Sequence, residues 1–469
     1  MQLWTAWVDA VLPMRKAFSR ERTFLWFLTI LIAFSIRSDL IGVTSFVRAL
    51  SLFPQTYPLL LNTLHSSANR LSQLRFIWTH HCLKIFSPFL VQFNNRIVLI
   101  ADGIKNPKEG RKMPGIKSCH QESTNNSKPE YVMAHSCQTI CLLVQGVLTF
   151  FAVPLACEIH EGVVFSNGDK RTLYDKLILL LNQLNLMRSF YFVADAYYAT
   201  RKIAFSLLKQ GQHLVSRVRS NAVAYFPYIS DPSQKKRRGR PTFYGSKVKL
   251  KSIFEKIADF TMISSPFLDD KNVQIQIFTQ DLIWRSIGKL VRFVWVIHPT
   301  RGRWILMTTD TTLTAIQVVQ LYGMRFRIEL AFKQAIYLVG AFGYHLWMKG
   351  MDRIKKCSSG QFLHHKSDQY RKQVIRKMRA YEIYIQYGLI ALGLMQYLAL
   401  KYPLQVFKEF RGWYRTLNTN KTPSEAVVAN ALQNTCPEFL MNLPKTHIIK
   451  KFLINKISWL YYSAKKVAA

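Results

Sequence analysis

The sequence predicts an α/β protein in which a mixed sheet with helices is interrupted by a β-rich insertion and flanked by helical N- and C-terminal regions. Three observations support this fold class. Apolar runs typical of buried strands recur from residue 96 onward, and two of them end in Ala-Asp. Segments with helical periodicity separate the later strands. A second group of β-rich stretches lies between residues 218 and 300.

The N-terminal region, residues 1–95, is predicted to be helical. Its helices are interrupted at four prolines, Pro13, Pro54, Pro58 and Pro88. The apolar run over residues 24–36 contains thirteen residues, which is too short to cross a membrane. No pattern here specifies chemistry, so the region is a candidate DNA-binding or packing domain.

Residues 96–217 are predicted to form the first part of the sheet. The expected elements are strands at Arg96–Ala101, Ser136–Val144 and Val147–Ala152, a helix at Thr172–Leu186, a strand at Phe190–Val193, a helix at Tyr198–Gln210 and a strand at His213–Arg217. Residues 103–133 are expected to be a polar connection, and Gln145-Gly146 a hairpin turn. Three strands, helix, strand, helix, strand is the ribonuclease-H-like order.

The remaining chain divides into three further regions. Residues 218–300 are predicted to be the β-rich insertion, and residues 301–345 the second part of the sheet domain, with a strand at Trp304–Thr309 and a long helix at Thr314–Leu338. Residues 346–469 are predicted to be helical and basic. Within them, residues 349–379 hold ten Lys or Arg and two Asp, which favours contact with a phosphate backbone over a merely solvated surface.

The charge balance indicates a polyanionic partner. Lys and Arg number 64 against 26 Asp and Glu, so the formal net charge is +38. Such an excess favours nucleic acid or an anionic membrane face. The aromatic content of 13% is typical of a folded chain and not of a disordered basic tail.

The sequence favours neither a membrane span nor a zinc site. Ile383–Leu400 is apolar, but it carries Gln386 and Gln396, so a buried helix is expected and not a membrane span. The seven cysteines have no disulfide-like rhythm and indicate a reducing cytosol. Cys119 and Cys137 each lie near a histidine, but no Cys-x2-Cys spacing supports a zinc site.

Asp102 and Asp195 are the first candidate catalytic residues. Each closes an apolar run, in the sequences Ile-Ala-Asp and Val-Ala-Asp. A carboxylate at the carboxyl end of a buried strand lies where open α/β sheets bind their ligands. The alternative is structural, with Asp195 capping a helix and Asp102 in a turn. The two together suggest a shared metal site.

The helix predicted at Thr314–Leu338 supplies a third carboxylate. Tyr322, Arg325, Glu329 and Lys333 follow one another at offsets of three, four and four, which places them on one face. Three carboxylates from separate elements suffice for two Mg²⁺ ions in phosphodiester cleavage. The alternative is that Glu329 forms salt bridges with its basic neighbours.

With these residues the chain resembles the DDE transposases of bacterial insertion sequences, in the group with a β-stranded insertion inside a ribonuclease-H-like domain. The resemblance covers roughly residues 20–400. The motifs that carry it are Ala101-Asp102-Gly103, Gly110-Arg111-Lys112-Met113-Pro114-Gly115, Ala134-His135-Ser136, Asp195-Ala196-Tyr197-Tyr198 and the helix around Glu329.

The resemblance implies an activity. Asp102, Asp195 and Glu329 would be the metal-binding catalytic triad, with Mg²⁺ as the cofactor and Mn²⁺ as a substitute. The enzyme would cut double-stranded DNA at terminal inverted repeats and join the ends to target DNA, as a homodimer or larger oligomer. It would act in the bacterial cytoplasm, associated with the nucleoid and without a membrane partner. The alternative is a catalytically inactive DNA-binding protein of the same fold.

Several basic residues are candidates for DNA contact. The related motif runs Tyr-x2-Arg-x3-Glu-x6-Lys, and Tyr322, Arg325 and Glu329 match it, but Ile336 occupies the lysine position. We expect Lys333, one turn beyond Glu329, to take over the phosphate contact. The other candidates are Arg111 and Lys112, together with Arg238 and Arg240 in a weak match to a minor-groove AT-hook.

Overall fold

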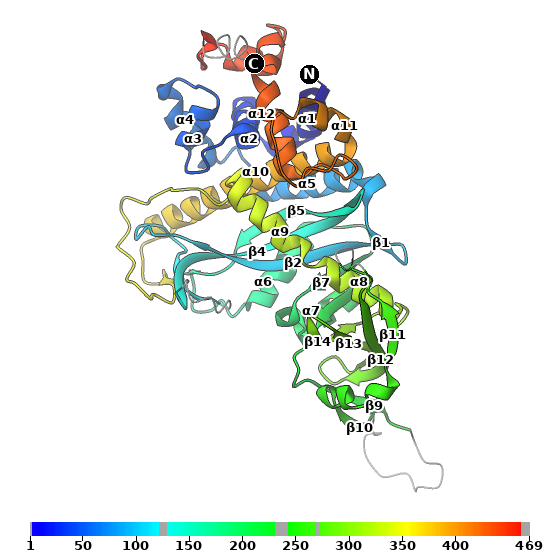
Figure 1. Ribbon diagram of the computed structural model, residues 1–469. Coiled ribbons are helices and arrows are strands. Elements are labelled where there is room, and N and C mark those ends of the chain that lie inside the picture. The colour runs from blue at the N-terminus through cyan, green and yellow to red at the C-terminus, as the bar shows by residue number, and fades with distance from the viewer. Residues whose placement is uncertain (1, 122–128, 230–242, 268–269, 271, 461–469) are drawn as a thin grey trace. The chain divides into compact units, whose positions relative to one another are not determined.

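The computed structural model describes residues 2–121, 129–229, 243–267, 270 and 272–460. The chain forms two compact units, each assembled from separate parts of the sequence (Figure 1). Unit 1 contains Met1–Leu90, Gly103–Leu186 and Ile328–Ala469, and unit 2 contains Val91–Asp102 and Met187–Arg327. The strand β2 (Arg96–Pro107) belongs to both units, because the division follows Asp102.

Unit 2 is built on a mixed sheet. Its parallel part consists of β2, β7 (Phe190–Ala194) and β8 (His213–Arg217). The residues of β7 are all buried, and so are Ile97 to Ala101 of β2, as expected for strands covered on both faces. The helix α7 (Arg201–Lys209) connects β7 to β8 and buries Ile203, Ala204 and Leu207.

The antiparallel part of this sheet comes from the predicted insertion and the strand after it. Long strands β12, β13 and β14 pair in sequence, and β14 continues the sheet onto β8. Shorter strands extend the other edge. The bounds are β1 Gln92–Phe93, β9 Val223–Pro227, β10 Tyr244–Lys249, β11 Thr261–Ser264, β12 Gln274–Trp284, β13 Lys289–His298 and β14 Gly302–Thr308. Residues 218–300 are therefore β-rich, as their composition predicts.

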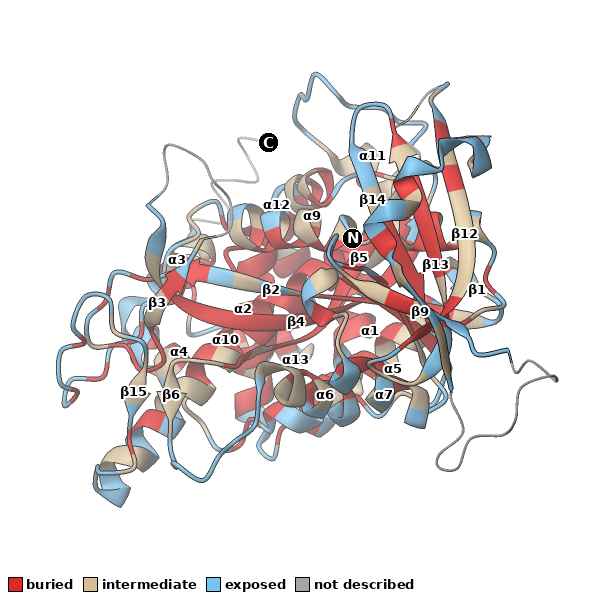
Figure 2. Ribbon diagram, turned by 90° about the horizontal axis from the view of Figure 1, so that it is seen from below, coloured by how far each residue is buried: buried red, intermediate tan, exposed pale blue. Residues whose placement is uncertain are grey.

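Unit 1 contains a long hairpin of β4 (Tyr131–Gly146) and β5 (Thr149–Ile159), with β3 (Lys117–His120) paired to β4. The central residues of β4 are buried and appear red in Figure 2. Gly146 pairs with Thr149, so the turn is at Val147-Leu148, two residues later than predicted. Gly146 is required by close approach, since a Cβ there would lie 2.4 Å from Oγ1 of Thr422.

The long helix α10 (Asp368–Lys401) covers this hairpin. Gln386 donates from Nε2 to the carbonyl of Leu155 at 3.0 Å, and Gln396 to that of Ala152 at 3.4 Å. Both glutamines therefore bond to the backbone of β5 inside the core. Among the described residues this is the one helix long and apolar enough to cross a membrane, and 94% of its most apolar window is buried. The prediction of a buried helix at Ile383–Leu400 is confirmed.

The other helices of unit 1 pack around α10. In α2 (Glu21–Ile36) the apolar run is buried, and Phe27 contacts Tyr387 of α10 with ring centroids 4.6 Å apart. The remaining bounds are α1 Gln2–Val11, α3 Thr44–Ala49, α4 Tyr57–Leu64, α5 Leu71–Ile85, α6 Leu173–Gln183, α11 Pro403–Glu409, α12 Glu425–Asn442 and α13 Ile448–Leu453, with two short paired strands β6 Val163–Val164 and β15 Gln361–Phe362.

The structure corrects two local predictions in these regions and agrees with a third. The polar connection at residues 103–133 is wrong in part, because β2 continues to Pro107 and β3 lies within it. The helix predicted from Tyr198 begins at Arg201, after a short 3-10 turn at Ala196–Tyr198. The seven cysteines are free, in agreement with the absence of a disulfide rhythm.

Candidate active site

Strand pairing in unit 2 brings Asp102 and Asp195 to the same level of the sheet. β2 and β7 run parallel, with Ile100 paired to Val193. Each aspartate follows its paired residue by two positions. Side chains alternate between the faces of a strand, so both carboxylates emerge on the same face, from neighbouring strands about 4.8 Å apart. The two Ala-Asp segments of the sequence therefore lie side by side, with Asp102 within β2 and Asp195 directly after β7.

Asp195 also caps the turn that follows it. Its Oδ1 accepts a hydrogen bond from the backbone N–H of Tyr197 at 3.0 Å, and its carbonyl accepts one from the Ser216 hydroxyl at 2.7 Å. The capping interpretation is therefore confirmed for Asp195. It does not prevent metal binding, because an ionised carboxylate has two oxygens with about four acceptor positions.

Asp102 does not lie in a turn, as its structural alternative predicted, but within β2. Its Oδ2 accepts a hydrogen bond from Nη1 of Arg325 at 2.8 Å. The side chains are 18% exposed for Arg325 and 20% for Asp102, so this ion pair is largely buried. The sequence predicted that Arg325 contacts a phosphate or, alternatively, pairs with Glu329, and it did not indicate this contact with Asp102.

A cleft with a volume of ≈ 640 Å³ opens beside Asp195 in unit 2. Its lining residues come from the turn after β7, from β8 and the loop after it, and from α8 (Ala315–Met324) and its C-cap. They are Asp195, Ala196, Arg217, Val218, Arg219, Ser220, Asn221, Tyr322 and Arg325. Three of them are arginines, which suits an anionic ligand. Arg217 and Arg219 were not predicted, although their place at the carboxyl end of a third parallel strand was a usable signal.

Tyr322 lies in the same cleft, one turn before Arg325. Burial raises the pKa of Tyr322 above its ordinary value, while the positive charges of Arg325 and Arg217 oppose the rise. The phenol is therefore neutral at physiological pH, and it can donate a hydrogen bond to an anion held by the arginines.

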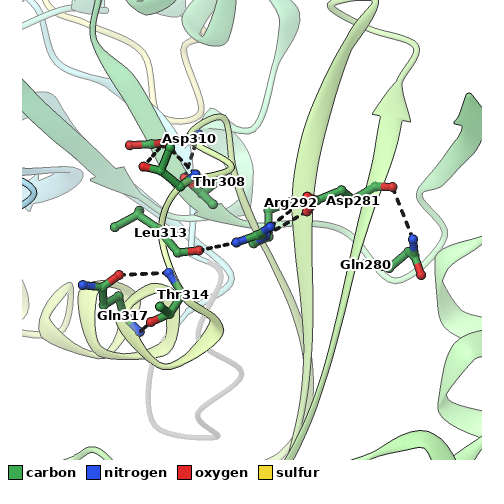
Figure 3. A network of polar contacts seen from close by, with 9 residues as sticks. Gln280, Asp281, Arg292, Thr308, Asp310, Leu313, Thr314 and Gln317 are labelled. Carbon is green, nitrogen blue, oxygen red and sulfur yellow. Dashed lines mark hydrogen bonds and ion pairs between the residues drawn. The ribbon is translucent and has the colours of Figure 1, made fainter.

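The β-rich insertion fixes the start of α8, as Figure 3 shows. Thr314 and Gln317 form a capping box, in which the side chain of each accepts from the backbone N–H of the other. Arg292 on β13 donates to the carbonyl of Leu313 at 2.7 Å and to both carboxylate oxygens of Asp281 at 2.8 Å. The helix that presents Tyr322 and Arg325 is thus tied to β12 and β13.

The predicted long helix at Thr314–Leu338 is wrong, because it breaks after Met324. The last turn of α8 tightens, with the N–H of Arg325 bonded to the carbonyl of Tyr322 at 3.1 Å. Gly323, a poor helix former, lies in that turn. A second helix, α9 (Arg327–Gln334), follows and continues as a π-helix at Ala335–Val339.

The third predicted carboxylate, Glu329, follows this break in the chain. Glu329 lies on α9 in unit 1, half-buried, whereas Asp102 and Asp195 belong to unit 2. Lys333 is exposed in the last turn of α9, and Ile336 lies in the π-helix. Across the described residues, no group of three or more His, Cys, Asp or Glu side chains is arranged to hold a metal ion. The triad with Glu329 stays a prediction.

The carboxylate pair by itself fits a hard divalent cation. Mg²⁺ prefers oxygen ligands, keeps several waters and is commonly held by one or two carboxylates. Asp102 and Asp195 offer that donor set at one edge of a buried sheet. The histidine of one His–Cys motif of the sequence is engaged elsewhere, since buried His135 bonds to the hydroxyl of Tyr344 at 2.7 Å and to the carbonyl of Pro114 at 2.8 Å.

Arg111 and Lys112, two other predicted DNA contacts, are not among the residues that line this cleft. Arg111 and Lys112 are in the loop after β2 in unit 1, where their carbonyls accept from the N–H groups of Ile354 and Met348. The loop therefore lies against the basic segment that begins at Lys349. Arg238 and Arg240 lie outside the described residues.

Three comparisons with known proteins bear on this geometry. Residues 83–261 match the family model described as DDE superfamily endonuclease. No curated protein matches the chain. Among solved structures, a piggyBac transposase synaptic complex with hairpin DNA is similar at a TM-score of 0.37 and 11% identity, over 93% of this chain and 76% of that one. The segment similar to DDE superfamily endonucleases thus contains both Asp102 and Asp195.

Proposed function

We propose that this protein is a DNA transposase that uses a divalent metal ion to cleave double-stranded DNA at the ends of an insertion sequence and to join those ends to target DNA. The observation that carries the proposal is the strand register that places Asp102 and Asp195 together, within the segment that matches the DDE superfamily endonuclease model. The net charge of +38 supports a DNA partner.

In this proposal Asp102, Asp195 and Glu329 hold Mg²⁺, or Mn²⁺ in its place. The bound ions would activate the attacking water or 3′-hydroxyl and stabilise the leaving oxygen. The side chains of the cleft would bind and orient the DNA phosphate. Arg217 and Arg219 neutralise and orient the phosphate beside Asp195, and Tyr322 donates a hydrogen bond to it.

A paired cleavage and binding assay tests the proposal. The substrate is duplex DNA that carries the sequences flanking the gene, with Mg²⁺ or Mn²⁺. Asp102→Asn, Asp195→Asn and Glu329→Gln should each abolish nicking, yet retain binding in a gel shift, because they remove carboxylates and not phosphate contacts. Asp259→Asn, an exposed carboxylate of unit 2, is the matched control and should cleave normally.

The outcomes separate the proposal from its alternative. Robust cleavage by one of the three variants would remove that residue from the triad. If the native protein binds these DNA ends and does not nick them with either ion, a catalytically inactive DNA-binding protein of the same fold becomes the better description. Native cleavage with all three variants inactive supports the triad, including Glu329 from unit 1.

A further inference from the structure

The ion pair between Arg325 and Asp102 places a fixed positive charge on one of the three proposed metal ligands. Nη1 of Arg325 lies 2.8 Å from Oδ2 of Asp102, and both side chains are largely buried. Charges removed from bulk water interact more strongly than exposed pairs do. The pair therefore holds the Asp102 carboxylate firmly, in the position where a divalent cation would bind it.

The position of Arg325 is imposed by the fold. Its helix, α8, is capped by Thr314 and Gln317, and the preceding Leu313 carbonyl is bonded to Arg292. Arg325 directly follows the last residue of that helix, so its backbone position is fixed independently of what its side chain contacts. The side chain is also long enough to leave Asp102 and enter the cleft, which it already lines together with Arg217 and Arg219.

A divalent cation and the guanidinium compete for the same carboxylate. A cation at Oδ2 of Asp102 must displace Arg325 or lie beside it, and two positive charges at such a distance repel each other in a partly buried site. A guanidinium displaced from Asp102 can bind a DNA phosphate instead. The planar guanidinium donates two parallel hydrogen bonds that match the geometry of a phosphate.

We propose that Arg325 exchanges between two anions. It neutralises Asp102 while no metal ion is bound, and it moves to a DNA phosphate when a divalent cation takes the carboxylate. Metal and DNA then bind with positive coupling, because each favours the same position of Arg325. The inference rests on the proposed function, since it takes Asp102 as a metal ligand, and it adds an order to the assembly of the site.

The coupling predicts an effect that a simple supporting role for Arg325 does not. If Arg325 competes with the metal ion, its removal should tighten metal binding in the absence of DNA. Coupling between ligands in proteins is typically about 5- to 150-fold, and we expect a gain within that range. If Arg325 only orients Asp102 for the metal ion, its removal should weaken metal binding.

The experiment measures Mn²⁺ binding to the full chain without DNA, by the electron paramagnetic resonance signal of free Mn²⁺. Arg325→Gln should bind Mn²⁺ about 5-fold or more tightly than the native protein. Arg219→Gln is the matched control, because it removes an arginine of the same cleft and leaves the pair with Asp102 intact. Asp102→Asn should lose the site, and Arg325→Lys, which keeps the charge, should bind like the native protein.

A second measurement adds a short DNA duplex of arbitrary sequence. DNA should tighten Mn²⁺ binding to the native protein and change it little in Arg325→Gln, since that variant has no guanidinium to transfer. Circular dichroism establishes that each variant is folded, and Arg325→Met, which also removes the charge, replaces Arg325→Gln in both measurements if Arg325→Gln does not fold.

The outcomes distinguish failure of the proposed metal site from failure of the Arg325 exchange. If Mn²⁺ binding by the native protein does not depend on Asp102, both the metal site and the exchange are overturned. If binding depends on Asp102 but Arg325→Gln binds no more tightly than Arg219→Gln, the exchange is overturned and the proposed function stands. Tighter binding in Arg325→Gln alone, with loss of the DNA effect, supports the exchange.

Discussion

Arg37 holds the end of the helical segment that carries Glu329, and its replacement by methionine should destabilise unit 1. Its side chain is 6% exposed. Nε and Nη2 donate to the carbonyl of Val339 at 3.0 and 2.7 Å, and Nη2 also donates to that of Gly340 at 2.8 Å. Nη1 donates to the hydroxyls of Ser45 at 2.6 Å and Tyr384 at 3.2 Å. These contacts join the end of α2 to the end of the π-helix after α9.

The magnitude follows from the acceptors that lose their donor. Methionine keeps the apolar stem against the rings of Phe34 and Phe46, which lie 4.5 and 4.8 Å from the guanidinium carbon. It leaves the carbonyls of Val339 and Gly340 without this donor, at about 1–3 kcal/mol for each unsatisfied buried group. Removal of the buried cation offsets part of this loss of stability, because burial disfavours the charged guanidinium and lowers the pKa of Arg37. We expect a net loss of about 2–4 kcal/mol.

Urea unfolding followed by circular dichroism measures this change for Arg37→Met. Arg48→Met is the matched control on the neighbouring helix α3, because Arg48 pairs with Asp39 at the surface, where the two side chains are 60% and 41% exposed. Exposed ion pairs contribute about 0–1 kcal/mol. Equal, small losses for the two variants would refute the assigned role of Arg37. Arg37→Met should also cleave DNA more slowly where it is fully folded, since the end of the Glu329 segment is no longer anchored.

Three further predictions concern charge. DNA binding should weaken steeply with salt, with a slope of log K against log salt of about −5 if six phosphates are neutralised, and a slope near zero in a filter-binding titration would contradict the DNA partner. Lys333→Ala, titrated with end DNA in the Glu329→Gln background, should reduce that slope by roughly one unit, whereas an unchanged slope would make Lys333 structural. Glu382 is largely buried beside Arg75, and burial raises its pKa from 4.5 to about 7. The folded state therefore binds this proton more tightly than the unfolded chain, so its stabilising effect is complete below pH 4.5 and is lost as the pH rises through 7. Unfolding midpoints between pH 5 and 8 should fall more for the native protein than for Glu382→Gln, and parallel pH profiles would exclude this assignment.

The strands around the site were predictable because their signal is local. A strand covered on both faces needs consecutive apolar residues, and Phe190–Ala194 supplies them without interruption. The strand predicted at His213–Arg217 has the observed bounds. The order of three strands, helix, strand, helix and strand is present along the chain, with the short strands β3 and β6 as additions. These features depend on a few neighbouring residues, which the sequence displays directly.

The break between α8 and α9 was not predictable from periodicity. Apolar residues recur with helical spacing on both sides, and a continuous helix satisfies them equally well. The break arises where the last turn tightens around Gly323, and where Arg325 turns toward Asp102. It also divides the chain between its two units, so Glu329 falls in a different unit from the two aspartates.

The sequence by itself determined that two aspartates follow buried strand segments, since each Ala-Asp closes an uninterrupted apolar run. Only the tertiary structure decided what those strand ends contact. Asp102 and Arg325 are 223 positions apart, and Arg37 is 302 positions from Val339. Contacts at such separations leave no periodic pattern, because they depend on how the whole sheet and the helices around it pack. The partner of a buried charge is therefore a property of the folded chain, whereas the strand that presents it is a property of a few consecutive residues.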